Sequence, residues 1–214
     1  MRLHIGDWNY SSWSMRPWLA LSHAGVPFET VLNRLPEDHV PGRGPAFTHV
    51  SPTGRVPVLE VSGVLIADSL AICEWAAEQA PGLWPEVALA RAQARSAAAI
   101  MHAGFPALRQ DCPMNLRRRT DPSRMTEAGR SDAALMDRLW CSWLERSGGP
   151  FLFGRWSVAD AMYAPAASRF LTYDIPRSST AEAYIAAVLG EPHALEWIRR
   201  AHADERALAR TDSV

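Results

Sequence analysis

The feature that most constrains the fold of this chain is a change of sequence pattern near residue 86. Before it, short apolar runs alternate with loops rich in proline and glycine, a pattern typical of short strands mixed with helices. After it, alanine, leucine, arginine and glutamate dominate with a helical period, and these are good helix formers. We therefore predict an α/β domain over residues 1–80, a linker over 81–86 and an all-helical domain over 87–214.

The composition excludes several functional classes. A chain of 214 residues can form one large domain or two small ones, and its net charge of −1 gives no reason to expect nucleic acid or an anionic membrane as a partner. No apolar run of membrane length is present. The three cysteines are scattered without metal spacing and suit a reducing compartment, so we expect a cytoplasmic protein without a metal site.

The basic residues are unusual because all 22 of them are arginine. The absence of lysine excludes Schiff-base chemistry on a lysine and the attachment of pyridoxal phosphate. No glycine-rich phosphate loop and no Gly-x-Ser-x-Gly sequence is present. The exclusive use of arginine also favours a GC-rich bacterial genome.

The first motif covers residues 10–18, Tyr-Ser-Ser-Trp-Ser-Met-Arg-Pro-Trp. It places several hydroxyls between a strand predicted over 3–7 and a helix predicted over 16–24, which Pro17 would open. Free N–H groups and the positive end of the dipole make a helix start a favourable place for an anion such as a thiolate.

The second motif is a predicted hairpin followed by a helix. Apolar runs over 56–61 and 64–66 are joined by a Ser-Gly pair, and Pro57 at the strand edge is a candidate for a cis peptide. Asp68 is a natural N-cap for a helix over 68–78, which places Ser69 among the free N–H groups of that helix.

The third motif, residues 156–161, predicts a helix start in which Ser157 and Asp160 form a capping box. The apolar period of the second half predicts several further helices, and the last four residues are expected to be frayed. The predicted helices cover 88–109, 130–147, 158–171, 180–189 and 193–203.

In this order the motifs resemble the cytosolic glutathione S-transferase family from Leu3 to about Arg200. The first is similar to the Ser-Ser-Cys-Ser-Trp-Arg signature of the zeta, or maleylacetoacetate isomerase-like, class. The resemblance implies a thioredoxin-like N-terminal domain and an all-α C-terminal domain. It further implies a bacterial homodimer that uses glutathione as a co-substrate against a small electrophile.

The chain departs from the zeta signature at Trp13, which stands where that class has cysteine. This departure favours a general glutathione transferase of a bacterial serine type over a cis-trans isomerase of the maleylacetoacetate type. A third hypothesis is that the protein is a non-catalytic binding module with the same fold. Such modules generally lose the residues retained here as Ser12, Pro57 and Ser69.

The resemblance also assigns roles to individual residues. Ser12 is the expected thiolate donor, with Ser11 as the alternative, and Arg16 is expected to be structural. The glycyl carboxylate of glutathione would meet a side chain of the loop before the hairpin. The candidates for that contact are His39, Arg43 and His49. The expected glutathione-binding residues are Ser11, Ser12, Trp13, Arg55, Val56, Pro57, Asp68 and Ser69, and the expected contacts of the electrophile are Trp8, Tyr10, Trp13, Met101, His102 and Phe105. Arg109, on the same stretch of helix as Met101, and the following turn with Met114 and Asn115 are expected on the same side of the mouth.

Overall fold

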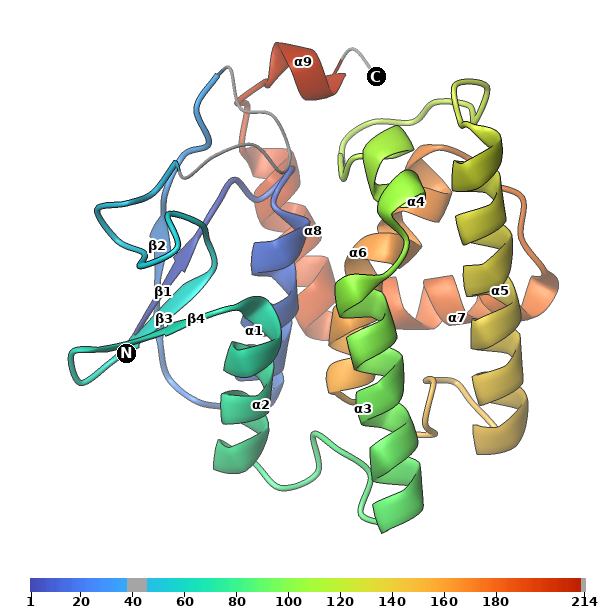
Figure 1. Ribbon diagram of the computed structural model, residues 1–214, viewed down its shortest axis with the longest axis horizontal. Helices are drawn as coiled ribbons and strands as arrows, with labels where there is room; N and C mark the ends of the chain where they lie inside the picture. Colours follow the sequence, from blue (N-terminus) through green and yellow to red (C-terminus); the bar gives the residue numbers. More distant parts are fainter. Residues whose placement is uncertain (38–45, 213–214) are drawn as a thin grey trace.

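The computed structural model describes residues 1–37 and 46–212. A four-stranded sheet and two helices form the first part of the chain, and they lie beside a helical bundle (Figure 1). The strand order is β2-β1-β3-β4, in which β1 pairs parallel with β2 and antiparallel with β3. The elements of this part are β1 (Arg2–Ile5), α1 (Ser12–His23), β2 (Glu29–Leu32), β3 (Val58–Val61), β4 (Val64–Ala67) and α2 (Ser69–Gln79).

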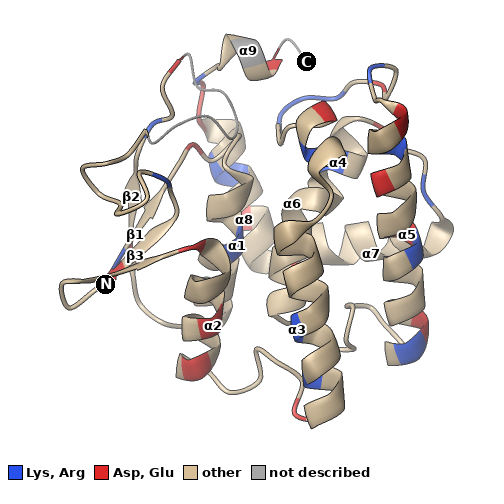
Figure 2. Cartoon of the chain, in the orientation of Figure 1, with Lys and Arg blue, Asp and Glu red and all other residues tan. Residues whose placement is uncertain are grey.

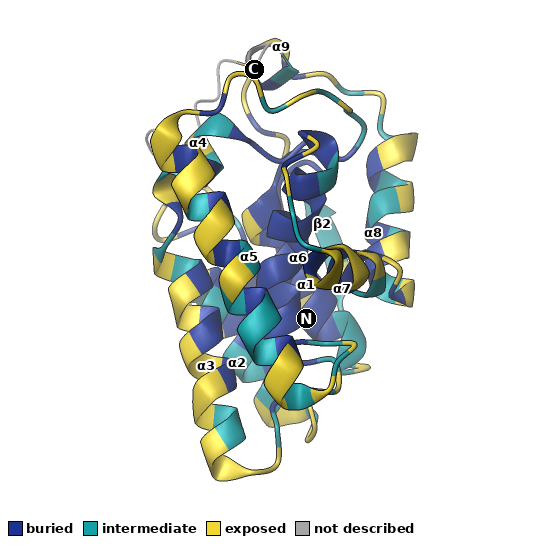
Figure 3. Ribbon diagram, turned by 90° about the vertical axis from the view of Figure 1, so that its right-hand side faces the viewer, coloured by how far each residue is buried: buried dark blue, intermediate teal, exposed yellow. Residues whose placement is uncertain are grey.

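The second part consists of helices in the described residues, and this confirms the thioredoxin-like plus all-α fold class. Helix α6 lies at its centre and is almost entirely buried, as Figure 3 shows in dark blue. None of the described helices is both long and apolar enough to span a membrane. The helices are α3 (Ala88–Ala103), α4 (Pro106–Asp111), α5 (Glu127–Ser147), α6 (Val158–Thr172), α7 (Ser179–Leu189), α8 (Pro192–Ala203) and α9 (Ala209–Asp212).

The predicted hairpin forms between β3 and β4, with Val61 paired to Val64. Its central residues Ser62 and Gly63 both have positive φ, at 50° and 82°. Two positive φ values are what a type I′ turn requires, and this turn matches the twist of the strands. Asp68 caps α2 as predicted, since its Oδ1 accepts from the N–H of Leu70 at 2.8 Å.

Helix α1 begins at Ser12, four residues earlier than predicted, and Pro17 lies inside it. The prediction that Pro17 opens the helix is therefore wrong. A proline in a helix interior removes one backbone hydrogen bond. Here that loss is outweighed by packing, because Met15 and Leu19 on either side of the proline are at most 1% exposed.

The helix predicted over 88–109 is two helices instead. Helix α3 ends at Ala103, and Phe105 adopts a left-handed backbone with φ 59° before Pro106 starts α4. Proline disfavours helical backbone in the residue that precedes it, which explains the break at this point. The helical spacing of the apolar residues continues across this break, so the sequence pattern did not reveal it.

The end of the chain is also more ordered than predicted up to residue 212. Residues 209–212 form the short helix α9, and the carboxylate of Asp212 accepts from the Tyr10 hydroxyl at 2.9 Å and from Asn115 Nδ2 at 2.7 Å. These hydrogen bonds to a charged group hold the terminal turn against the turn that precedes α1.

The predicted linker over 81–86 falls between α2 and α3 and is packed. Leu83 and Trp84 are each 7% exposed. The N–H of Val158 donates to the Leu83 carbonyl at 3.0 Å, and Trp84 Nε1 donates to Glu74 at 3.0 Å. The connection therefore fastens α2 to the start of α6.

The predicted capping box at the start of α6 is present. The Asp160 carboxylate accepts from the backbone N–H groups of Ser157 at 2.9 Å and of Leu152 at 3.1 Å. Burial raises the pKa of Asp160 to about 6, against the lowering effect of these hydrogen bonds. The box thus fixes both the helix start and the loop before it.

We expect Asp160→Ala to lower the free energy of unfolding by about 2–4 kcal/mol, because it removes the cap and leaves two buried N–H groups unpaired. Urea denaturation at pH 7 measures this loss. Thr126→Ala, which removes the exposed cap of α5, is the matched control and should cost about 1 kcal/mol. Equal losses in both variants would contradict a special role for Asp160.

Candidate active site

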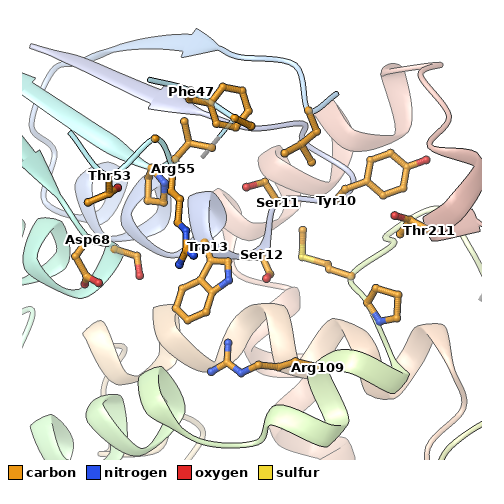
Figure 4. Close-up of a pocket in the computed structure, with 18 of the residues that line it drawn as sticks. Tyr10, Ser11, Ser12, Trp13, Phe47, Thr53, Arg55, Asp68, Arg109 and Thr211 are labelled. Atoms are coloured by element: carbon orange, nitrogen blue, oxygen red, sulfur yellow. The ribbon is translucent and has the colours of Figure 1, made fainter. Parts of the chain in front are cut away.

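A cavity of about 650 Å³ lies between the sheet-containing part and the helical bundle (Figure 4). One wall comes from the turn before α1, the loop before β3 and the start of α2. The other wall comes from α3, α4, α6 and the C-terminal segment. The volume falls in the ordinary range for sites that bind small molecules.

The turn before α1 holds Ser11 against the body of the protein. The Ser11 hydroxyl donates to Ser14 Oγ at 2.8 Å, and this oxygen also accepts from the N–H of Gly6 at 3.0 Å. A Cβ at Gly6 would lie 2.9 Å from the Ser11 side chain, so glycine is needed for the close approach. The hydroxyl of Ser11 is therefore already engaged inside the protein.

Ser12 is held differently, because its Oγ accepts a hydrogen bond from Arg169 Nη2 at 3.2 Å. The same guanidinium donates to the carbonyls of Cys112 at 2.8 Å and Pro165 at 3.1 Å, which fixes its orientation. Since Arg169 supplies the donor, the hydroxyl proton of Ser12 remains available to another acceptor.

Trp13 lies against two guanidinium groups. Its ring centroid is 4.3 Å from Cζ of Arg16 and 4.7 Å from Cζ of Arg109, distances that permit cation–π attraction. Figure 4 shows Trp13 and Ser12 facing Arg109 across the cavity. With 37% of its surface exposed, Trp13 also presents apolar area to a ligand.

The three arginines Arg16, Arg109 and Arg169 have no carboxylate partner among the described residues. Burial lowers the pKa of Arg109 to about 10, and burial together with the charge of Arg109 lowers the pKa of Arg169 to about 10. Burial and both neighbours also hold the pKa of Arg16 well below its usual range. Arg109 and Arg169 remain protonated at neutral pH and make this wall of the cavity positive.

The opposite wall ends at the start of α2. The Ser69 side chain is 2% exposed, and its Oγ has no hydrogen-bond partner among the described residues. A buried hydroxyl without a partner is costly, so this oxygen is suited to a polar ligand group. Next to it, Asp68 has a strained backbone with φ 116° and its Oδ2 lies 3.3 Å from His102 Nε2.

The structure brings most of the predicted site residues together. The Val56–Pro57 peptide is cis, as predicted. His39 and Arg43 lie outside the described residues, and His49 is exposed and is not part of the lining. The predicted residues that line the cavity are Tyr10, Ser11, Ser12, Trp13, Arg55, Val56, Pro57, Asp68, Ser69 and His102.

Three predicted contacts of the electrophile, Trp8, Met101 and Phe105, lie in the core and do not line the cavity. The Trp8 ring packs on Trp197 with a centroid distance of 4.4 Å. Met101 and Phe105 are 1% and 4% exposed. Sequence periodicity identified these side chains as apolar but did not indicate the direction in which they point.

Other lining residues were not predicted as site residues. Arg169 is the most consequential, and its only sequence signal is a charge within a helix that is otherwise almost entirely apolar. Arg109 and Met114, which were expected on the electrophile side, do line the cavity, and Arg109 lies after the break at Phe105, which changes its direction relative to a continuous helix. Further lining residues that were not predicted are Phe47, Thr53, Leu208 and Thr211.

Comparison with known proteins agrees with this arrangement. Residues 10–79 match the family model of the glutathione S-transferase N-terminal domain. A maleylpyruvate isomerase from Ralstonia is 33% identical over 143 residues, which is 63% of this chain and 62% of the relative. A maleylacetoacetate isomerase from Pseudomonas aeruginosa is 33% identical over 121 residues, which is 55% of this chain and 56% of the relative.

Solved structures share the fold over nearly the whole chain. A glutathione transferase homologue from Burkholderia, with bound glutathione, has a TM-score of 0.72 at 21% identity and covers 95% of this chain and 98% of its own. A holo structure of a zeta-class maleylpyruvate isomerase has a TM-score of 0.69 at 23% identity, and the match covers 97% of this chain and 100% of that chain.

The fold is thus that of the solved glutathione transferases, and residues 10–79 match the N-terminal domain of that family. The chain is similar to glutathione S-transferases over residues 10–79 and to the two isomerases over 63% and 55% of its length. The alignments span less than two thirds of the length of the two isomerases.

Proposed function

We propose that this protein is a glutathione transferase in which Ser12 stabilises the thiolate of glutathione for attack on a small electrophile. The observation that carries the proposal is the hydrogen bond from Arg169 to Ser12 Oγ at the wall of the cavity. It occupies the oxygen of the hydroxyl and leaves the proton free, whereas the Ser11 hydroxyl is engaged by Ser14. This contrast favours Ser12 over Ser11 as the donor.

The thiol of glutathione is mostly neutral at pH 7, since an ordinary thiol has a pKa near 8.5, and the thiolate is the nucleophile. Three features of the chain favour the charged form. The Ser12 hydroxyl donates to the sulfur, the start of α1 places a positive dipole end beside it, and Arg109 and Arg169 add positive charge. The thiolate then attacks an electrophile bound near Trp13. In an addition the π electrons of the attacked double bond move onto the electrophile and take up a proton, and in a substitution the leaving group departs with its electron pair.

The remaining wall fits the rest of the tripeptide. The unpartnered Ser69 hydroxyl would donate to the γ-glutamyl carboxylate, and the Asp68 carboxylate would bind the ammonium group of glutathione. The backbone of Val56 before Pro57 is placed to pair with the cysteinyl part. Arg55, which Figure 4 shows reaching into the cavity, is the described residue best suited to the glycyl carboxylate.

We further propose that each chain consists of two domains, residues 1–80 and 87–214. Two such chains would form a homodimer in a bacterial cytoplasm. Large apolar side chains are exposed on β4 and around α3, and the side of α3 that faces the viewer in Figure 2 carries few charges. Exposed apolar area of this kind favours association. The exposed residues are Val64, Leu65, Val87, Leu89 and Ile100.

A second candidate function is glutathione-dependent isomerisation of a carboxylic acid, since the two relatives are named as isomerases of maleylpyruvate and maleylacetoacetate. The observation that favours it is the positive charge of the cavity wall formed by Arg109 and Arg169. Nη1 of Arg109 is buried without a hydrogen-bond partner, and no carboxylate of the described residues forms an ion pair with Arg109 or Arg169. An electrophile with a carboxylate would supply the missing charge.

We expect bound glutathione to have a thiol pKa about two units below the free value, equivalent to roughly 2.7 kcal/mol, and Ser12→Ala to raise it again by at least one unit. Turnover should fall at least about tenfold, which is about 1.4 kcal/mol. Thiolate absorbance as a function of pH measures the shift. In the control Ser11→Ala the thiol pKa should not change, and a larger effect there would contradict the assignment to Ser12.

Ser69→Ala should weaken glutathione binding about tenfold, because a hydrogen bond to a charged group contributes about 1.5–3 kcal/mol. The melting temperature should not fall, since this hydroxyl has no protein partner to lose. Calorimetric titration and thermal unfolding give both quantities. A clear loss of thermal stability with unchanged affinity would make Ser69 a structural residue only.

Arg109→Gln should lower kcat/KM about tenfold more for an electrophile that carries a carboxylate, such as maleylpyruvate, than for a neutral chloronitrobenzene, for which only the contribution of Arg109 to thiolate stabilisation is lost. Arg109→Lys keeps the charge and should restore most of the preference. Arg95→Gln, on the exposed part of α3, is the control. Equal losses for both electrophiles would reject a carboxylate contact at Arg109.

A further inference from the structure

A second cluster of chemically active side chains lies at the far end of α1 from Ser12. His23 is the last residue of α1, Glu191 is the N-cap of α8, and His193 follows in the first turn of α8. One ligand atom from each of the three lies within 4.8 Å of the other two. His23 Nε2 is 2.9 Å from Glu191 Oε1.

Contacts around the cluster hold these groups in place. The His23 ring stacks on Trp156 with a centroid distance of 3.4 Å and an interplanar angle of 14°, and it meets His193 edge to face at 4.8 Å. The other carboxylate oxygen of Glu191 accepts from the N–H groups of His193 at 3.0 Å and Ala194 at 3.1 Å. These bonds leave Oε1 as the oxygen that faces His23.

The short contact between His23 and Glu191 is not a well-formed hydrogen bond. His23 Nε2 is buried and makes no hydrogen bond of good geometry with a described residue, although Glu191 Oε1 lies 2.9 Å away. Glu191 itself is 8% exposed and has no ion pair with an arginine in the described structure. A buried imidazole nitrogen beside a carboxylate oxygen is therefore poorly satisfied as a simple ion pair.

We propose that His23, Glu191 and His193 bind one Zn²⁺ ion. Two imidazoles and one carboxylate form a ligand set that zinc uses in proteins, with water in the fourth position. Bond lengths of about 2.0–2.2 Å place the ligand atoms of a tetrahedral ion about 3.4 Å apart. The His23 and Glu191 atoms are already near that separation, and His193, which is partly exposed, is the side chain that moves to complete the site.

The ion would have a structural role separate from the cavity. None of the three ligands lines the cavity, and the length of α1 from Ser12 to His23 corresponds to about 16 Å. The ligands come from the end of α1 and the start of α8, two segments distant in the sequence. Zinc would therefore cross-link the sheet-containing part of the chain to the helical bundle.

The test is a calorimetric titration of Zn²⁺ into the full-length, tag-free protein after removal of metal by chelation. We expect saturable binding of one ion with a dissociation constant in the micromolar range or below. At a free Zn²⁺ concentration of about one hundred times that constant, the melting temperature should rise by about 5–10 °C. Mg²⁺, which prefers oxygen ligands, should give neither effect.

Variants locate the site. His193→Ala should weaken Zn²⁺ binding at least tenfold, whereas His202→Ala, which removes an exposed histidine of the same helix, should have no effect. In the unaltered protein, the imidazole NMR signals of His23 and His193 should shift on addition of Zn²⁺ and those of His202 should not. Absence of saturable binding, or equal binding by His193→Ala, would overturn the proposal.

Discussion

The structure depends on the burial of helix α1 between the sheet and the helical bundle. Its Trp18 donates from Nε1 to Thr30 of β2 at 3.1 Å, and the same ring meets Trp197 of α8 at a centroid distance of 5.6 Å. Because α1 contacts both halves, its position fixes the distance between them. The start of this one helix carries Ser12, and its end carries His23, so the cavity and the histidine cluster share a single rigid support.

The exclusive use of arginine has a physical consequence in this setting. A lysine as deeply buried as Arg169, which is 4% exposed, would readily lose its proton. The guanidinium retains its charge at neutral pH even though burial lowers the pKa of Arg169 to about 10. Its planar group also donates to two carbonyls and to Ser12 together, which a single ammonium could not do in the same geometry.

The sequence was sufficient where local chemistry determines structure. The hairpin, the caps at Asp68 and Ser157, the cis Pro57 and the change to helices near residue 86 follow from neighbouring residues alone. It was insufficient where tertiary packing decides. Pro17 lies inside a helix because of what surrounds α1, and the break at Phe105 directs Arg109 into the cavity. The same reason explains why Trp8 was misplaced and why Arg169 was missed.

The packed connection between α2 and α3 limits how ligands enter and leave. A hinge between the two halves would have to expose Leu83 and Trp84 and break the hydrogen bond from Val158, at a cost of several kcal/mol. Large rotation of one half against the other is therefore disfavoured. Exchange with solvent should instead proceed by local displacement of the C-terminal segment, where Leu208 and Thr211 line the cavity, so ligand access would depend on the hydrogen bonds that tie Asp212 to Tyr10 and Asn115.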